Sequence, residues 1–168
     1  MPKISGIIKN SVVDGPGLRT AIFFSGCRRK CPGCHNPEAQ CFNNGLDIEE
    51  AFGGVDESQY LKFCQRAGDS GITLTGGHPL EPENYEEAHK LCNIAHELGM
   101  NVWLYTGYIF EQIPIMYMDL IGDCDVVVDG PFIESLKSSE CLYRGSTNQR
   151  IIDIQKTMEQ GEVILWNK

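Results

Sequence analysis

Residues 20–34 read Thr20-Ala-Ile-Phe-Phe-Ser-Gly-Cys-Arg-Arg-Lys-Cys-Pro-Gly-Cys34. The apolar run at 20–24 is typical of a strand covered on both faces, as in a parallel sheet. Three thiols, Cys27, Cys31 and Cys34, follow on a loop that contains Pro and Gly, so they can converge on one side of a soft metal centre. Three thiolates leave one iron of a cubane cluster open to a substrate. The stretch therefore predicts a buried strand followed by a metal-binding loop that takes part in a reaction rather than only in the structure.

A closed site with four ligands is the alternative. Structural zinc usually takes four ligands, and His35 or Cys41 would have to supply the fourth. His35 is a poor candidate, because adjacent side chains in an extended loop tend to point apart and Cys34 would already hold the ion. Cys41 is sterically feasible. A four-thiolate zinc or cluster site through Cys41, in a structural or electron-transfer protein, therefore stays open at this point.

The bulk properties indicate one globular domain. A chain of 168 residues is long enough to bury a sizeable core, and we expect a single domain over 1–168. The formal net charge of −9 argues against binding to nucleic acid or to an anionic membrane surface. We find no signal peptide pattern and no apolar run as long as a membrane span. We therefore expect a cytoplasmic protein.

The remaining cysteines are mostly expected in the core. Cys64 and Cys92 fall on the apolar sides of predicted helices, and Cys124 opens an apolar strand. A free cysteine in such a position behaves as a small hydrophobic residue. Cys141 receives no assignment from the sequence.

Strand and helix patterns alternate along the middle of the chain. Besides 20–24, we expect strands at 72–75, 101–105 and 124–128. Helical patterns lie between them, at 56–68, 83–98 and, interrupted by Pro114, 109–121. This alternation predicts an α/β fold with a parallel sheet and right-handed crossovers. The variable tail, about 132–168, breaks the rhythm, and 162–166 is expected as an edge strand or short hairpin.

The first of these helices shows the clearest signals. Asp56 is expected at its N-cap and Gly68 at its end. Its apolar face is expected to consist of residues spaced at i, i+3, i+4 and i+7, namely Tyr60, Phe63, Cys64 and Ala67.

Ligands of a parallel α/β sheet collect at the carboxyl ends of its strands. The cysteine loop, Gly76-Gly77, Thr106-Gly107 and Asp129-Gly130 all follow such an end. Paired glycines let the backbone approach a polar ligand closely. Asp129 is expected either to bind a ligand hydroxyl or amine or to be a turn residue bonded to its own backbone.

Arg28, Arg29 and Lys30 form the dense basic cluster of an acidic chain. Either the cluster is part of a solvated loop, or it is a docking point for an acidic electron donor, because complementary charge steers such encounters.

Several motifs, taken jointly, carry a family resemblance. Asp14-Gly-Pro-Gly-Leu-Arg19, the C-x3-C-x2-C loop followed by His35-Asn36, and Gly76-Gly-His-Pro-Leu80 resemble the radical S-adenosylmethionine activases of glycyl radical enzymes. Further segments narrow the resemblance to activases of anaerobic ribonucleotide reductase: Trp103-Leu-Tyr-Thr-Gly-Tyr108, Val127-Val-Asp-Gly130 and Tyr143-Arg-Gly-Ser-Thr-Asn-Gln149. An activase of the formate-lyase type, or a small-molecule radical enzyme, is the alternative within this class.

The resemblance implies a fold and a cofactor set. The fold would be an incomplete parallel (β/α) barrel of the radical S-adenosylmethionine type, open on one side. Cys27, Cys31 and Cys34 would hold a 4Fe-4S cluster, whose fourth iron would bind the amino and carboxylate groups of S-adenosylmethionine. Gly76 and Gly77 would bind the methionine end, and Gly33, Cys34 and His35 would complete the cofactor site, with Gly33 and His35 near the adenine.

The resemblance also implies a reaction. One electron from the cluster would cleave S-adenosylmethionine to methionine and a 5′-deoxyadenosyl radical, which would take a hydrogen atom from a glycine of the partner reductase. An acidic flavoprotein or a similar protein would supply the electron. No residue beyond the cluster and S-adenosylmethionine is assigned a catalytic role. His78 departs from the family pattern, in which an acidic residue is usual, so contacts that need that carboxylate are in doubt.

Overall fold

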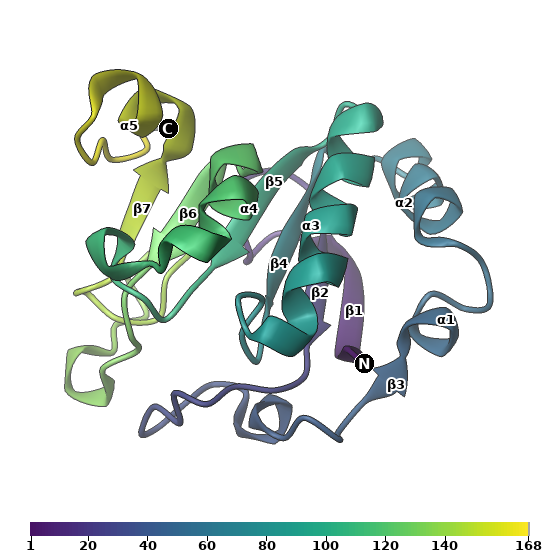
Figure 1. Ribbon diagram of the computed structural model, residues 1–168, viewed down its shortest axis with the longest axis horizontal. Coiled ribbons are helices and arrows are strands. Elements are labelled where there is room, and N and C mark those ends of the chain that lie inside the picture. The colour runs from purple at the N-terminus through teal and green to yellow at the C-terminus, as the bar shows by residue number, and fades with distance from the viewer. Residues whose placement is uncertain (168) are drawn as a thin grey trace.

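The computed structural model describes residues 1–167, which form a single seven-stranded sheet with the order β3-β1-β2-β4-β5-β6-β7 (Figure 1). The strands are β1 (Lys3–Ser11), β2 (Arg19–Phe24), β3 (Leu46–Asp47), β4 (Gly71–Gly76), β5 (Asn101–Tyr105), β6 (Val126–Asp129) and β7 (Arg150–Asp153). The α-helices are α1 (Ile48–Ala51), α2 (Glu57–Arg66), α3 (Pro82–Glu97), α4 (Met118–Asp123) and α5 (Ile154–Gln160). Short 3-10 helices are η1 (Pro37–Gln40), η2 (Phe110–Gln112), η3 (Ile115–Tyr117) and η4 (Glu134–Leu136).

The sheet is mixed, which corrects the expectation of a wholly parallel one. The pairings β2-β4, β4-β5 and β5-β6 are parallel, as predicted, whereas β1-β2, β1-β3 and β6-β7 are antiparallel. The short connection between β1 and β2 has no room for a crossover, so it can only form a hairpin-like pair. The described chain therefore has an α/β fold with a parallel centre and antiparallel edges, and its sheet is not closed.

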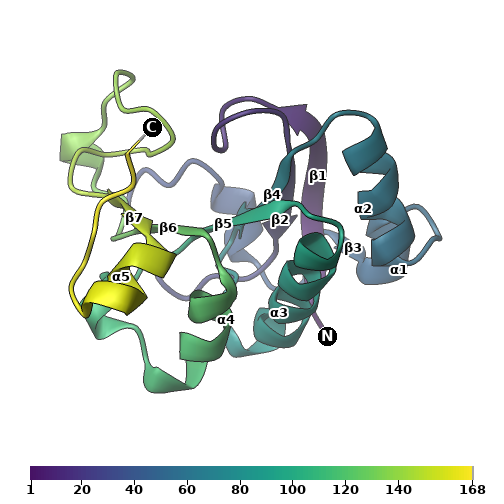
Figure 2. The same ribbon diagram turned by 90° about the horizontal axis from the view of Figure 1, so that it is seen from above.

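Helices cover one face of the sheet. Helices α3 and α4 lie along this face, and α2 lies beside β1 (Figures 1 and 2). Leu91 of α3 and Leu120 of α4 belong to the same buried apolar cluster as the strand residues Leu74, Val102 and Val127. Because strand side chains alternate between faces, every second residue of the central strands contributes to this core.

The opposite face is covered by loops rather than helices (Figure 2). Arg19 is fully buried there and donates hydrogen bonds to Thr73 Oγ1 at 2.9 Å and to Asn101 Oδ1 at 2.7 Å. Its guanidinium lies over the ring of Trp103, 5.5 Å from the centroid. Burial lowers the pKa of Arg19 to about 10, against the opposing effect of Tyr105 and nearby carboxylates. These contacts allow a charged group to remain beneath the loops.

Helix α2 confirms its predicted cap and part of its predicted face. The side chain of Asp56 accepts a hydrogen bond from Gln59 N at 2.9 Å. Phe63 is 56% exposed, so its assignment to the apolar face is wrong. Cys64 is buried as predicted, and the residue buried with it is Leu61, one turn earlier. The buried stripe of the helix is therefore shifted away from Phe63.

The other expected elements are mostly confirmed. Strands β2, β4, β5 and β6 and helix α3 are found close to their predicted ranges, and 109–121 is broken into η2, η3 and α4 around Pro114. The sequence reasoning missed β1, β3, α1 and α5. In the tail, 162–166 contacts β7 through the bridge between Ile152 and Leu165 and through backbone hydrogen bonds from Asp153 N to Ile164 O and from Trp166 N to Ile151 O.

The core cysteines lie where the sequence places them. Cys64, Cys92 and Cys124 are buried, and their thiols are free. In the part of the chain that the structure describes, no helix combines the length and the apolar character needed to cross a bilayer.

Candidate functional site

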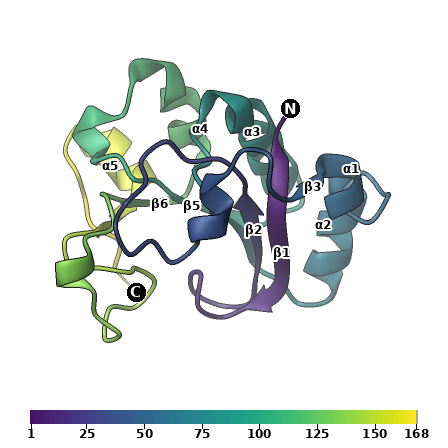
Figure 3. The same cartoon turned by 90° about the horizontal axis from the view of Figure 1, so that it is seen from below.

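The cysteine loop leaves β2 and passes across the ends of the central strands before the chain reaches η1 (Figure 3). Backbone hydrogen bonds tie its start to the segment after it, from Gly26 N to Ala39 O at 2.7 Å and from Cys27 N to Gln40 O at 3.2 Å. A tight turn joins Cys34 N to Cys31 O at 3.2 Å. The loop is therefore anchored at its base and presents its cysteines beyond the sheet.

All three thiols of this loop are free and partly exposed. Burial raises the pKa of the Cys27 thiol, against the opposing effect of the N–H groups of Arg29 and Lys30. Cys34 Sγ accepts a hydrogen bond from Asn36 N at 3.4 Å. Because thiolates are the ligands of iron and zinc, metal binding at Cys27 would release a proton.

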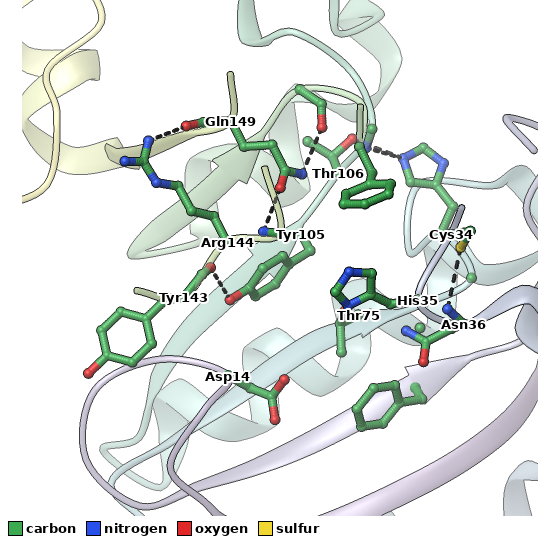
Figure 4. Close-up of a pocket in the computed structure, with 18 of the residues that line it drawn as sticks. Asp14, Cys34, His35, Asn36, Thr75, Tyr105, Thr106, Tyr143, Arg144 and Gln149 are labelled. Carbon is green, nitrogen blue, oxygen red and sulfur yellow. Dashed lines mark hydrogen bonds between the residues drawn. The ribbon is translucent and has the colours of Figure 1, made fainter. Parts of the chain in front are cut away.

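A cavity of about 370 Å³ lies beside this loop at the carboxyl ends of β4, β5 and β6 (Figure 4). Among the residues that line it are four predicted cofactor contacts: Cys34, His35, Gly76 and Gly77. Gly33, Cys27 and Cys31 lie outside this lining. Most of the predicted cofactor residues therefore line one cavity, and the cysteine loop contributes Cys34 to its wall.

The paired glycines at the end of β4 have a packing reason as well as a chemical one. A Cβ on Gly77 would lie 2.5 Å from Gly26 O and 2.6 Å from Ala39 O, and one on Gly76 would lie 2.5 Å from Phe24 N. Gly76 also has a φ of 96°, which side chains rarely adopt. Glycines at these positions allow β4 to approach the base of the cysteine loop.

The C-terminal tail closes the other side of the cavity. Gln149 Oε1 accepts hydrogen bonds from Gly145 N at 2.8 Å and Ser146 N at 3.2 Å, and its Nε2 donates to Gly130 O at 3.1 Å. Tyr105 OH donates to Tyr143 O at 2.5 Å (Figure 4). The segment 143–149, which the sequence singled out only as a motif, is therefore folded around one glutamine to form a cavity wall.

Sequence reasoning missed four cavity residues outside the quoted motifs: Val13, Phe23, Thr75 and Phe132. Thr75 and Phe23 are the residues of β4 and β2 whose side chains face the loops, so strand alternation signals their position once the buried face is known. Cys141, which the sequence left unassigned, also lines the cavity.

The basic cluster is less available than the sequence suggests. Arg28 pairs with Glu81 and Glu83 and lies over the ring of Phe42, 4.3 Å from the centroid. The hydrogen bonds from Arg28 lower the pKa of Glu83. Arg29 stacks on Tyr108 at 4.6 Å. The positive charge of Arg28 is therefore balanced by two carboxylates of the same chain and is not free to attract a partner protein.

Asp129 has a different role from either prediction. It is buried at the end of β6, where it accepts a hydrogen bond from Phe110 N at 2.8 Å and pairs with Arg150 Nη2 at 2.5 Å. Its Oδ1 accepts a hydrogen bond from Arg150 N at 3.2 Å, so both oxygens are engaged in joining β6 to η2 and β7.

His89 and His96 lie on the helical side, where their Nε2 atoms are hydrogen-bonded to Asp123 Oδ2 at 2.8 Å and Asp125 Oδ2 at 3.0 Å.

The donor set fits an iron–sulfur cluster. Within residues 1–167, no three His, Cys, Asp or Glu side chains are arranged to hold a single metal ion. A cubane does not require that arrangement, because each cysteine binds a different iron. Three free, partly exposed thiols on one anchored loop suit such a cluster, and Cys41 is a fourth free thiol, exposed one residue beyond Gln40.

Comparisons with known proteins agree with this donor set. The family model of the 4Fe-4S single cluster domain matches residues 13–152. An anaerobic ribonucleoside-triphosphate reductase-activating protein of Escherichia coli K12 is 36% identical over 142 residues, covering 82% of this chain and 90% of that protein. Proteins of the same name are 36% identical in enterobacteria phage T4, over 83% of this chain and 86% of theirs, and 32% identical in Haemophilus influenzae, over 83% and 90%. The chain therefore belongs to the 4Fe-4S single cluster domain family and, within it, to the anaerobic ribonucleoside-triphosphate reductase-activating proteins.

Proposed function

We propose that this protein activates an anaerobic ribonucleotide reductase by generating a glycyl radical on it, through reductive cleavage of S-adenosylmethionine. The observation that carries the proposal is the juxtaposition of a three-thiol loop with a cavity whose floor is Gly76-Gly77, at the carboxyl ends of parallel strands. The names of the relatives supply the reductase as the target.

Cys27, Cys31 and Cys34 would hold the 4Fe-4S cluster. When bound, the cofactors would supply the radical chemistry, namely reductive cleavage of the sulfonium by one electron to methionine and a 5′-deoxyadenosyl radical that would take a hydrogen atom from a glycine of the reductase. The protein's own task is to bind, orient and shield these groups.

Backbone groups of Gly76 and Gly77 would bind the methionine end of S-adenosylmethionine beside Cys34. His35 and Phe132 meet edge to face with ring centroids 5.0 Å apart, and this aromatic wall suits a flat adenine. Gly33 belongs to the same loop, although it lies outside the cavity lining. Phe23 and Phe132 would exclude water from the reacting end of the ligand.

The open sheet suits a protein substrate. The edge strands β3 and β7 do not pair in the described chain, so the sheet is not closed, and a glycine-bearing loop of the reductase would reach the cavity from this open side. This arrangement would correspond to the incomplete barrel of the radical S-adenosylmethionine type. The physiological electron donor would be an acidic flavoprotein or a similar protein.

The test is anaerobic activation of the purified reductase. With S-adenosylmethionine and a reductant, we expect an electron paramagnetic resonance doublet of a glycyl radical and formation of 5′-deoxyadenosine. Cys34→Ala should abolish both, whereas Cys41→Ala should retain the cluster and both products. No radical on the reductase, or loss of the cluster in Cys41→Ala, would contradict the proposal and favour a four-thiolate metal protein.

A further inference from the structure

A buried carboxylate lies directly against the cysteine loop. Glu81 follows β4 by five residues and is 5% exposed. Its Oε1 accepts a hydrogen bond from the backbone N–H of Arg28 at 2.8 Å, and its Oε2 pairs with the Arg28 guanidinium. Arg28 is the residue after Cys27. A bond to its main chain therefore fixes the loop at the first thiol.

His78 connects this carboxylate to the neighbouring strand. Its Nε2 accepts from Gly107 N at 3.3 Å and lies 2.9 Å from Thr106 Oγ1, just beyond the end of β5. Because Nε2 is the acceptor, the ring proton is assigned to Nδ1, which lies 3.7 Å from Glu81 Oε1. His78 is 3% exposed, so this connection is shielded from water.

The surroundings of Glu81 favour its carboxylate form. Burial raises the pKa of Glu81, but the contact with His78 and the hydrogen bonds from Arg28 outweigh this effect and lower the pKa to about 2. Glu81 is also the N-cap residue of α3 but makes no capping hydrogen bond with its side chain. Its contacts therefore go to the cysteine loop rather than to its own helix.

Glu83 provides a natural comparison. It pairs with the same guanidinium, with Arg28 Nη2 2.5 Å from Glu83 Oε1 and Arg28 Nη1 2.8 Å from Oε2. Its side chain is 38% exposed and has no bond to the loop backbone among the described contacts. Removing Glu83 would loosen only the outer side of Arg28.

We propose that Glu81 is a positioning residue for the cysteine loop, which holds the Cys27 end of the loop through the Arg28 backbone and is itself oriented by His78. The proposal rests on the proposed function only in taking Cys27, Cys31 and Cys34 as the cluster ligands. It assigns the preorganisation of those ligands to a residue outside the thiol motif and outside the cavity.

The first test follows amide hydrogen exchange of Arg28 in the cluster-free protein. Glu81→Ala should speed exchange of this amide about tenfold to a hundredfold, because a buried charge-assisted hydrogen bond is lost. Glu81→Gln keeps an oxygen acceptor and should restore most of the protection. Glu83→Ala is the matched control and should exchange like the wild type.

The second test measures iron and sulfide bound per chain after reconstitution. Loading should fall in Glu81→Ala and recover in Glu81→Gln, with Glu83→Ala unchanged. If Glu81→Ala does not fold, Glu81→Asp, whose shorter side chain cannot reach the amide, should show the same faster exchange. Wild-type exchange at Arg28 in Glu81→Ala and Glu81→Asp, or an equal effect of Glu83→Ala, would overturn the inference. If the wild-type protein does not cleave S-adenosylmethionine, the proposed function is overturned instead.

Discussion

The helix-covered face of the sheet and its loop-covered face are held together by different interactions. On the first, apolar side chains from α3, α4 and the central strands pack into one cluster whose members are almost all fully buried. On the second, glycines that allow backbone contact and a glutamine-centred tail line a cavity, and a buried arginine makes hydrogen bonds elsewhere beneath the loops. The residues that form the apolar core and those that form the candidate site thus lie largely on opposite faces of one sheet.

Because of this difference, substitutions on the two faces should affect different properties of the protein. A change on the helical face removes apolar contacts and should lower the free energy of unfolding while leaving the cofactor site intact in the molecules that remain folded. A change on the loop face should alter metal and ligand binding with little effect on stability. The following predictions test that separation, from the largest expected effect to the smallest.

The largest effect is expected in the cysteine loop. Replacing Cys27, Cys31 or Cys34 with Ala should reduce 5′-deoxyadenosine formation below detection, because each removes a cluster ligand. Cys92→Ala, on the helical face, is the matched control: it removes a buried thiol and should keep both iron content and activity. Iron analysis and chromatography of the products check this. Wild-type activity in a loop variant would refute the ligand assignment.

A core truncation should show the opposite pattern. Leu91→Ala should lower the free energy of unfolding by about 2–5 kcal/mol, because Leu91 is fully buried against the sheet. Urea denaturation of the cluster-free protein measures this value. The amount of cluster bound per folded chain should not change, and a proportional fall in both quantities would show that the two faces are coupled.

The carboxyl pair between α2 and α3 should make stability depend on pH. Burial raises the pKa of Glu87 to about 7, against the attraction of Lys90, with Glu57 adding to the rise. The folded state then binds more protons than the unfolded state between about pH 4.5 and 7, so the free energy of unfolding should fall as pH rises through this window. Glu87→Gln should flatten that slope, with an effect on the order of 1–3 kcal/mol near pH 7. If the free energy of unfolding of Glu87→Gln depends on pH as in the wild type, a group other than Glu87 causes the dependence.

The smallest effect is expected at the basic cluster. Arg29→Gln and Lys30→Gln together should slow reduction of the cluster by an acidic flavoprotein but not by dithionite. Arg28→Gln should contribute less to this electrostatic effect, because its charge is balanced by Glu81 and Glu83. Stopped-flow reduction with both donors provides the comparison. Equal slowing with dithionite would dismiss the docking role.

The sequence predicted the helical face better than the loop face. Hydrophobic periodicity located β2, β4, β5, β6 and α3, because these elements are fixed by local apolar patterns. It misjudged part of the face of α2, where Leu61 rather than Phe63 is buried beside Cys64. Strand β1 was missed because only Ile4 and Ser11 are buried in it, so its pattern shows no regular alternation.

The candidate site was predicted in composition but not in geometry. The thiols, the paired glycines and the tail motif are visible in the sequence, yet nothing local places Gln149 beside Gly130 or brings Glu81 to the cysteine loop. Such contacts join residues far apart in the chain and depend on how loops close over the sheet. In the sequence, His78 stands where the family pattern has an acidic residue. In the structure its side chain has defined partners at Thr106, just beyond β5, and at Glu81.

The most direct test of the central claim is anaerobic electron paramagnetic resonance of the reconstituted, reduced protein with and without S-adenosylmethionine, with 5′-deoxyadenosine measured in the same samples. The account predicts a reduced-cluster signal that changes when S-adenosylmethionine is added, together with 5′-deoxyadenosine in the wild type and in Cys92→Ala but not in Cys34→Ala. A cluster signal indifferent to S-adenosylmethionine, or zinc bound in place of iron, would contradict it.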